Sequence, residues 1–127
     1  MEIQTPWTNS NTIKPKDTNN FNREWFSGEI YVDKSEKKGF TILRITVHGK
    51  HPKKKMIDDT TRTYYVESWT GEFIIDGEKK DALAGTLFII EPGHEYEYSG
   101  NMILMETNIS KSNTFKDELI ETLQKDI

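Results

Sequence analysis

The chain has 127 residues, a formal net charge of −4 and no cysteine. This length suits a single domain, and the absence of cysteine excludes a disulfide framework, a cysteine nucleophile and a zinc–thiolate site. The acidic balance gives no reason to expect nucleic acid as a partner, because phosphate binding needs a concentrated basic surface.

The amino-terminal residues 1–22 are predicted to form a flexible arm. They are rich in Asn, Thr and Pro and show no sustained apolar period. They also lack the basic start and the apolar run of a secretory signal. No stretch of the chain approaches the roughly 20 apolar residues that span a bilayer. We therefore expect a soluble, cytoplasmic protein without a membrane partner.

A barrel of short strands is predicted for residues 23–110. In one of them, Leu43, Ile45 and Val47 alternate with polar residues, as expected for a strand with one face in an apolar core. The turn Asp76–Gly77 is typical of a two-residue hairpin. The expected strands are Trp25–Val32, Phe40–His48, Arg62–Glu67, Gly71–Ile75, Lys79–Leu83, Thr86–Ile90, Glu95–Ser99 and Met102–Thr107. Short strands at this spacing predict an all-β sandwich or barrel.

One amphipathic α-helix is predicted for the carboxyl-terminal residues 111–127. Thr114, followed three residues later by Asp117, is typical of a helix N-cap. The apolar positions recur at helical spacing, at Phe115, Leu119, Ile120, Leu123 and Ile127. We expect the apolar face of this helix to pack on the barrel or against a second subunit.

The glycine spacing and the segments YYV, FIIDGE and AGTLFIIEPG carry a resemblance to a known family. Gly49 can open one motif, and Gly85, Pro92 and Gly93 mark a second. Residues 40–108 thus resemble the cupin superfamily, in particular its RmlC-like members. The resemblance implies a double-stranded β-helix, or jelly-roll barrel, that pairs into a homodimer through its edge strands.

The resemblance also shows that the usual metal-ligand positions are substituted. Lys55 and Ile57 stand at the two histidine positions of the first motif, Arg62 at its glutamate position, and Tyr96 at the histidine position of the second. Lysine and arginine are cations that repel a metal ion. We therefore expect no metal and no other cofactor.

The histidines leave one alternative open. If residues 48–61 are aligned differently, the chain can supply a metal site from displaced ligands. These ligands are His48, His51 and His94.

Hydrogen-bond donors in the predicted barrel favour a small organic ligand. A guanidinium matches a carboxylate or phosphate bidentately, and a tyrosine combines stacking area with a polar tip. The candidate ligand-binding residues are Arg62, Tyr64, Tyr96, Tyr98 and Lys55. The expected guest is anionic or sugar-like. Structural roles remain open as well: an ion pair for Arg62, core packing for the tyrosines and a solvated loop for the lysine.

Three functional classes fit this pattern. The first is a binding module that holds its ligand without a metal and without turnover. The second is a metal-independent isomerase or epimerase acting on a sugar or keto acid, with Tyr96 and His94 as its catalytic acid and base. The third is a metal-dependent oxygenase or isomerase that uses the displaced histidines.

Overall fold

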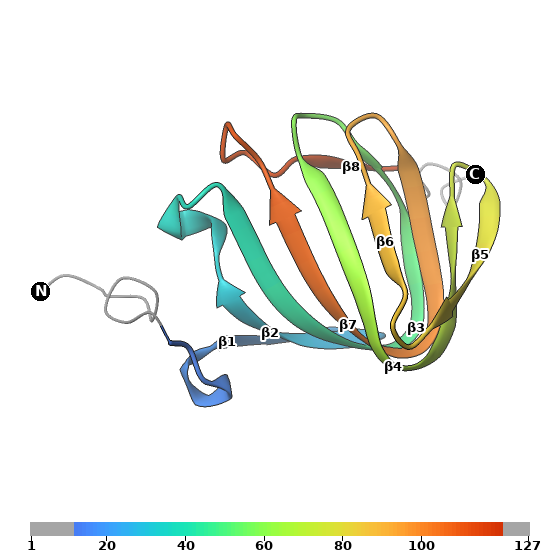
Figure 1. Cartoon of the computed structure of the whole chain (residues 1–127), viewed down its shortest axis with the longest axis horizontal. Coiled ribbons are helices and arrows are strands. Elements are labelled where there is room, and N and C mark those ends of the chain that lie inside the picture. The colour runs from blue at the N-terminus through green and yellow to red at the C-terminus, as the bar shows by residue number, and fades with distance from the viewer. Residues whose placement is uncertain (1–11, 121–127) are drawn as a thin grey trace, which may run out of the picture.

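The structure, a computed structural model, describes residues 12–120 as an eight-stranded antiparallel sheet that curls into a cup (Figure 1). Two short 3-10 helices, η1 (Pro15–Asp17) and η2 (Lys34–Glu36), interrupt it. The strands are β1 (Asn19–Asn22), β2 (Phe26–Val32), β3 (Phe40–Met56), β4 (Thr61–Ile75), β5 (Glu78–Leu83), β6 (Leu87–Ile90), β7 (Glu95–Ile109) and β8 (Asp117–Leu119). The prediction of an all-β fold is therefore confirmed.

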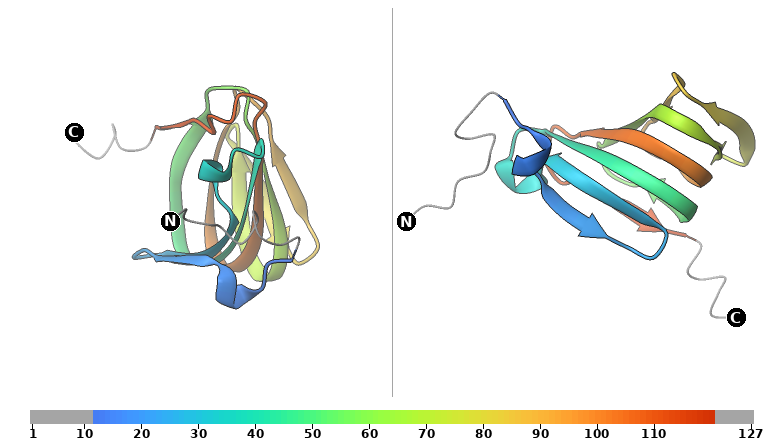
Figure 2. Two further views of the ribbon diagram at one scale, coloured as in Figure 1. Left: turned by 90° about the vertical axis from the view of Figure 1, so that its left-hand side faces the viewer. Right: turned by 90° about the horizontal axis from the view of Figure 1, so that it is seen from below.

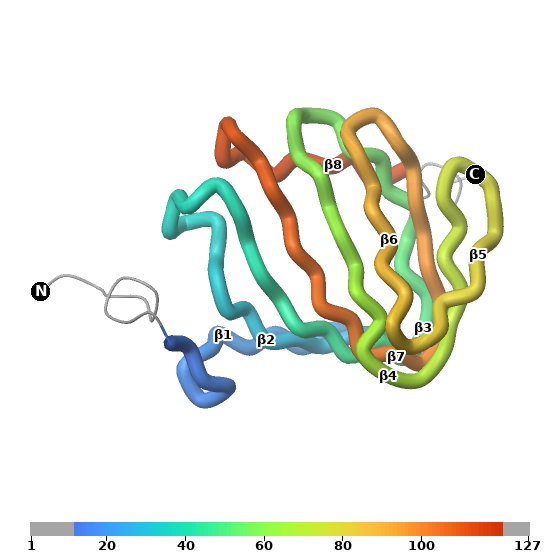
Figure 3. Tube along the Cα trace, in the orientation of Figure 1, coloured from blue at the N-terminus to red at the C-terminus, as the bar shows by residue number. Residues whose placement is uncertain are grey.

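Three long strands, β3, β4 and β7, make up the body of the cup. β7 lies between β3 and β4 and pairs with each of them over nearly its whole length. Each strand continues through a sharp bend, which Figure 3 shows at the lower end of the view. The prediction of separate strands Arg62–Glu67 and Gly71–Ile75 is therefore wrong, because β4 runs unbroken from Thr61 to Ile75.

A row of three glycines lies across these strands. Gly100 of β7 pairs with Gly49 of β3 on one side and with Gly71 of β4 on the other. Its φ of +133° suits glycine, and a Cβ at this position would lie 2.6 Å from the Gly71 Cα atom. The absence of side chains lets the strands approach closely here.

The concave face of the sheet carries the core. Ile45 and Val47, predicted to face inward, are buried, and Leu43 packs against the same cluster. Further large buried apolar side chains come from β2, β3, β4, β6 and β7, at Val32, Met56, Val66, Phe73, Phe88, Ile90, Met102 and Leu104. Burial of each such side chain contributes roughly 1.5–3 kcal/mol, so this face holds the barrel together.

The α-helix predicted for residues 111–127 is wrong for the part that the structure describes. Residues 117–119 form strand β8, which pairs with Lys54–Met56 of β3. Asp58 and Asp59 accept hydrogen bonds from backbone and hydroxyl groups of residues 110–116, and such side-chain bonds compete with helix formation. Residues 121–127 of the predicted helix lie outside the described residues.

Part of the predicted amino-terminal arm belongs to the sheet. β1 pairs with β2 from Asn19 opposite Ile30 to Asn22 opposite Ser27. Seen from below, β1, β2, β3, β7 and β4 lie side by side (Figure 2). Residues 1–11 of the arm lie outside the described residues. Among the helices of residues 12–120, none has the length and apolar character of a membrane span.

Candidate functional site

A cavity of about 300 Å³ lies inside the cup. Its apolar wall is formed by Phe21, Phe26, Ile30, Leu43 and Ile45. Its polar lining consists of Arg23, His51, Lys54, Arg62, Tyr64, Tyr98, Glu106 and Asp117. Two other hollows, of about 420 and 340 Å³, lie around Arg44 and around His94, and they are lined by exposed or half-buried residues only. The inner cavity is therefore the candidate site.

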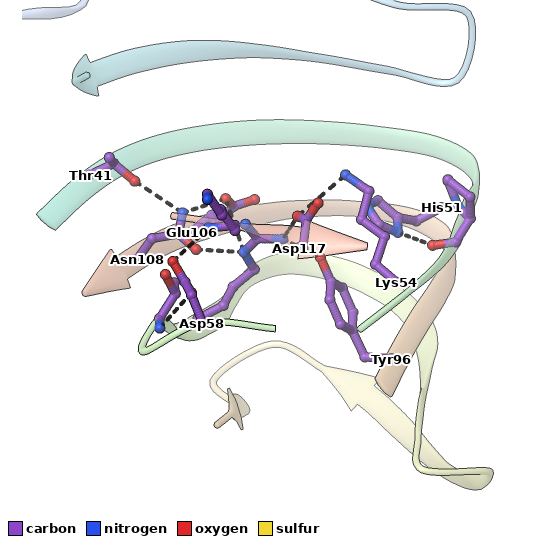
Figure 4. A network of polar contacts seen from close by, with 12 residues as sticks. Thr41, His51, Lys54, Asp58, Tyr96, Glu106, Asn108 and Asp117 are labelled. Atoms are coloured by element: carbon purple, nitrogen blue, oxygen red, sulfur yellow. Dashed lines mark hydrogen bonds and ion pairs between the residues drawn. The ribbon is translucent and has the colours of Figure 1, made fainter. Parts of the chain in front are cut away.

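Arg62 lies in a buried polar network beside this cavity (Figure 4). Its Nε donates to Asn108 Oδ1 at 2.5 Å, and its Nη1 donates to the Tyr96 hydroxyl at 2.6 Å and to Asp117 Oδ2 at 2.8 Å. Glu106 Oε2 lies 3.7 Å from Nε. Burial acts to lower the pKa of Arg62, but the tyrosine oxygens and carboxylates around it raise it well above its ordinary value. The guanidinium is therefore cationic and already engaged by groups of the protein.

The predicted tyrosines come together in the same region. The hydroxyls of Tyr64 and Tyr96 lie 3.0 Å apart, and Tyr98 is buried beside them. Burial raises the pKa of Tyr96 to about 12 and raises the pKa values of Tyr64 and Tyr98 well above 10.0. All three phenols are neutral at physiological pH and can act as hydrogen-bond donors.

His51 is also buried here, with 6% of its surface exposed. Its ring stacks on Tyr98 and Tyr96, with centroid distances of 4.5 and 5.3 Å. Nδ1 lies 2.5 Å from the carbonyl oxygen of Pro52. Because a carbonyl only accepts hydrogen bonds, this contact assigns the proton to Nδ1 and leaves the lone pair on Nε2.

The charge state of His51 follows from its surroundings. Burial, together with the positive charge of Lys54 and that of Arg62, lowers the pKa of His51 to about 3, although the bond to Pro52 opposes the shift. The ring is therefore neutral at physiological pH, and its unprotonated Nε2 can accept a proton.

The burial of neutral His51 should make the folded protein less stable as the pH falls. In the unfolded chain the ring takes up a proton near pH 6.5, whereas in the folded protein it does so only near pH 3. The unfolded state binds more protons between these values, so the contribution to stability is complete above pH 6.5 and falls as the pH drops. The loss amounts to about 5 kcal/mol at most. Urea denaturation from pH 7 to pH 4 should show a steeper fall for the wild type than for His51→Gln, and parallel curves would contradict the burial.

The lysine that lines the cavity is Lys54 and not the predicted Lys55. A bulge in the pairing of β3 with β7 lies between His51 and Lys54, and one extra residue reverses the alternation of inward and outward side chains. Lys54 Nζ lies 3.5 Å from Asp117 Oδ2. Sequence alternation alone contains no signal for this bulge.

The three histidines do not lie together. His48 is exposed on β3, whereas His94 is exposed beside the Asp76 turn, with Nδ1 2.5 Å from Asp76 Oδ2. The hydrogen bond that His94 donates to the Asp76 carboxylate raises the pKa of His94. Neither His94 nor Tyr96, its suggested catalytic partner, is among the residues that line the cavity, and His94 is exposed whereas Tyr96 is buried.

Solved structures of other proteins match most of the chain. The Streptomyces nucleoside dehydratase Pac13 superposes with a TM-score of 0.74 at 22% identity, covering 88% of this chain and 92% of that chain. Variants of Pac13 in which a histidine is changed to glutamine, or one of two tyrosines to phenylalanine, have been solved with uridine. KdgF from Halomonas sp. has a TM-score of 0.68 at 9% identity, covering 80% of this chain and 94% of that chain.

The cupin domain of Cnp3 from Schizosaccharomyces pombe also matches, with a TM-score of 0.66 at 12% identity, over 80% of this chain and 75% of that chain. This chain has a cupin fold. No protein-family model and no curated protein matches its sequence. The fold implied by the sequence resemblance is therefore confirmed.

The metal that many cupins bind does not fit the residues of this cupin. Two of the substituted positions hold a buried cation, Arg62, and an exposed apolar side chain, Ile57. The carboxylates that line the cavity, Glu106 and Asp117, pair with cations instead. Within residues 12–120, no three side chains of histidine, aspartate or glutamate lie together as metal ligands would.

Sequence reasoning missed four charged lining residues, Arg23, Lys54, Glu106 and Asp117. Glu106 is separated from Arg62 by 44 positions, and Asp117 by 55. The bulge determines the position of the lysine. Only strand pairing brings the two carboxylates to the cavity, so no local pattern indicates them.

Proposed function

We propose that this cupin is a metal-independent lyase that removes water from a nucleoside, with His51 as its base. The observation that carries the proposal is the sequence separation of one histidine and two tyrosines, which this chain shares with Pac13. The histidine and the two tyrosines replaced in the uridine-bound Pac13 variants are separated by 13 and then 34 positions. His51, Tyr64 and Tyr98 are separated by the same 13 and 34 positions, and all three line the cavity.

Elimination of water needs a base for a carbon-bound proton and a proton for the departing hydroxyl. Such a carbon acid requires a neighbouring carbonyl, so the substrate is a nucleoside whose sugar carries one. His51 Nε2 takes the proton next to the carbonyl, and the electrons of the C–H bond give an enolate. As the carbonyl re-forms, the new carbon–carbon double bond forms and the C–O bond to the β-hydroxyl breaks. His51 then returns the proton to the departing hydroxyl, which leaves as water, and no co-reactant is consumed.

The neighbours of His51 support this role. A pKa near 3 makes the ring a weak base in the empty cavity. Proton transfer, however, creates an enolate beside the imidazolium, and the attraction between these charges favours the protonated ring. Tyr64 and Tyr98 remain neutral donors that can hold the sugar oxygens.

Incubation of the full chain with a carbonyl-bearing nucleoside in heavy water tests the proposal. Mass spectrometry should show loss of one water from the substrate, with and without prior treatment of the protein with a chelator. Deuterium uptake without water loss would favour an isomerase instead. Tight binding of uridine with neither change would favour a binding module. Loss of activity after chelation would overturn the metal-independent mechanism.

A further inference from the structure

The carboxylate of Asp117 occupies the place where an anionic ligand would meet the cations of the cavity. Its Oδ2 lies 2.8 Å from Arg62 Nη1 and 3.5 Å from Lys54 Nζ, and its side chain is 21% exposed. Dashed lines in Figure 4 join Asp117 to Lys54 and to the guanidinium beside it. Both cations of the inner lining therefore already have an anion of the protein as partner.

The remaining charges of the lining leave little attraction for a second anion. Glu106 lies 3.7 Å from Arg62 on its Nε side. Two carboxylates therefore balance the two inner cations, Lys54 and Arg62. The other charged group of the lining, Arg23, is exposed, with its guanidinium 6.0 Å from the ring centroid of Phe21. A phosphate in the inner cavity would stand beside two carboxylates, and juxtaposed like charges disfavour binding.

Asp117 is held in this position by the strand that carries it and by the turn before it. β8 pairs with β3 at Lys54–Met56. Asp58 accepts a hydrogen bond from the Lys116 backbone N–H at 3.0 Å, and Asp59 accepts one from the Ser112 N–H at 2.9 Å. The backbone that carries Asp117 is therefore held beside the cavity by strand pairing and by these bonds.

We propose that Asp117 is a specificity-determining residue that makes the cavity select uncharged nucleosides over their phosphorylated forms. The inference rests on the proposed nucleoside substrate and names the form of it that the site accepts. The neutral hydroxyls of a sugar can donate to a carboxylate, whereas a phosphate is repelled by it. Replacement of Asp117 by asparagine removes the negative charge at nearly constant shape and releases Lys54 and Arg62 for an anion.

Calorimetric titration with uridine and with uridine 5′-monophosphate tests this role. The wild type should bind uridine at least about 10-fold more tightly than the monophosphate. Asp117→Asn should raise the affinity for the monophosphate relative to that for uridine by at least about 10-fold. Equal affinity of the wild type for both ligands, or an unchanged ratio in the variant, would overturn the inference.

Two further variants separate charge from structural damage. Asp117→Glu keeps the negative charge and should keep the preference for uridine. Glu118→Gln removes the same charge from a neighbouring exposed position of β8 that does not line the cavity, and it should behave as the wild type. A loss of preference in Asp117→Glu or in Glu118→Gln would contradict a role of the Asp117 charge.

Failure of the proposed function has a different signature. If neither uridine nor its monophosphate binds the wild type, the nucleoside assignment is wrong. The charge argument is then tested with inorganic phosphate alone, which should raise the unfolding temperature of Asp117→Asn but not that of the wild type or Glu118→Gln. Equal shifts in all three proteins would overturn the inference independently.

Discussion

Replacement of His51 by glutamine is expected to abolish elimination while uridine binding changes by only a few-fold. Glutamine keeps a polar side chain of similar length but has no lone pair basic enough to take a proton from carbon. General-base catalysis typically contributes about 10²- to 10⁴-fold, so the rate of the chemical step should fall by that factor. Single-turnover measurement of water loss gives this rate, and calorimetric titration with uridine gives the affinity.

The matched control for this experiment is His94→Gln. His94 is exposed, pairs with Asp76 and lies outside the cavity lining, so its replacement should leave the rate within about 2-fold of the wild type, as surface substitutions away from a site usually do. A His51→Gln protein that retains most of its activity would remove His51 from the mechanism. A large loss in His94→Gln would instead restore His94 as a catalytic candidate.

Replacement of Arg62 by methionine should cause the largest loss of stability. Arg62 has 7% of its surface exposed and is the partner of two carboxylates, Glu106 and Asp117. Without the guanidinium both carboxylates stay largely buried beside one remaining lysine, and Asn108 and Tyr96 lose a donor. Loss of one partner of a buried ion pair typically costs about 3–5 kcal/mol. Urea denaturation at pH 7 measures this loss.

Arg44→Met is the matched control for this stability measurement. Arg44 also pairs with two carboxylates, Glu67 at 3.1 Å and Glu29 at 3.5 Å, but its side chain is 34% exposed. Solvent can replace these contacts, so the expected loss is about 1 kcal/mol or less. Equal losses in the two variants would show that burial of the Arg62 network contributes nothing beyond an ordinary surface pair.

The sequence by itself determined the fold class and much of the core. Alternation in Phe40–His48 correctly predicted the inward face of β3, because a strand with one buried face must repeat every two residues. Glycine spacing correctly indicated the cupin architecture. The motif spacing indicated Arg62 and Tyr96. The two-residue repeat of a strand indicated that Tyr64 and Tyr98 share their inward-facing side.

Only the tertiary structure decided the chemistry of the cavity. A bulge brought Lys54 inward in place of Lys55, and burial beside the rings of Tyr96 and Tyr98 keeps His51 neutral. The helical spacing of residues 111–127 did not produce a helix in the described part, because hydrogen bonds donated to Asp58 and Asp59 and pairing with β3 favour an extended strand. These contacts join residues far apart in the chain, so no local period contains them.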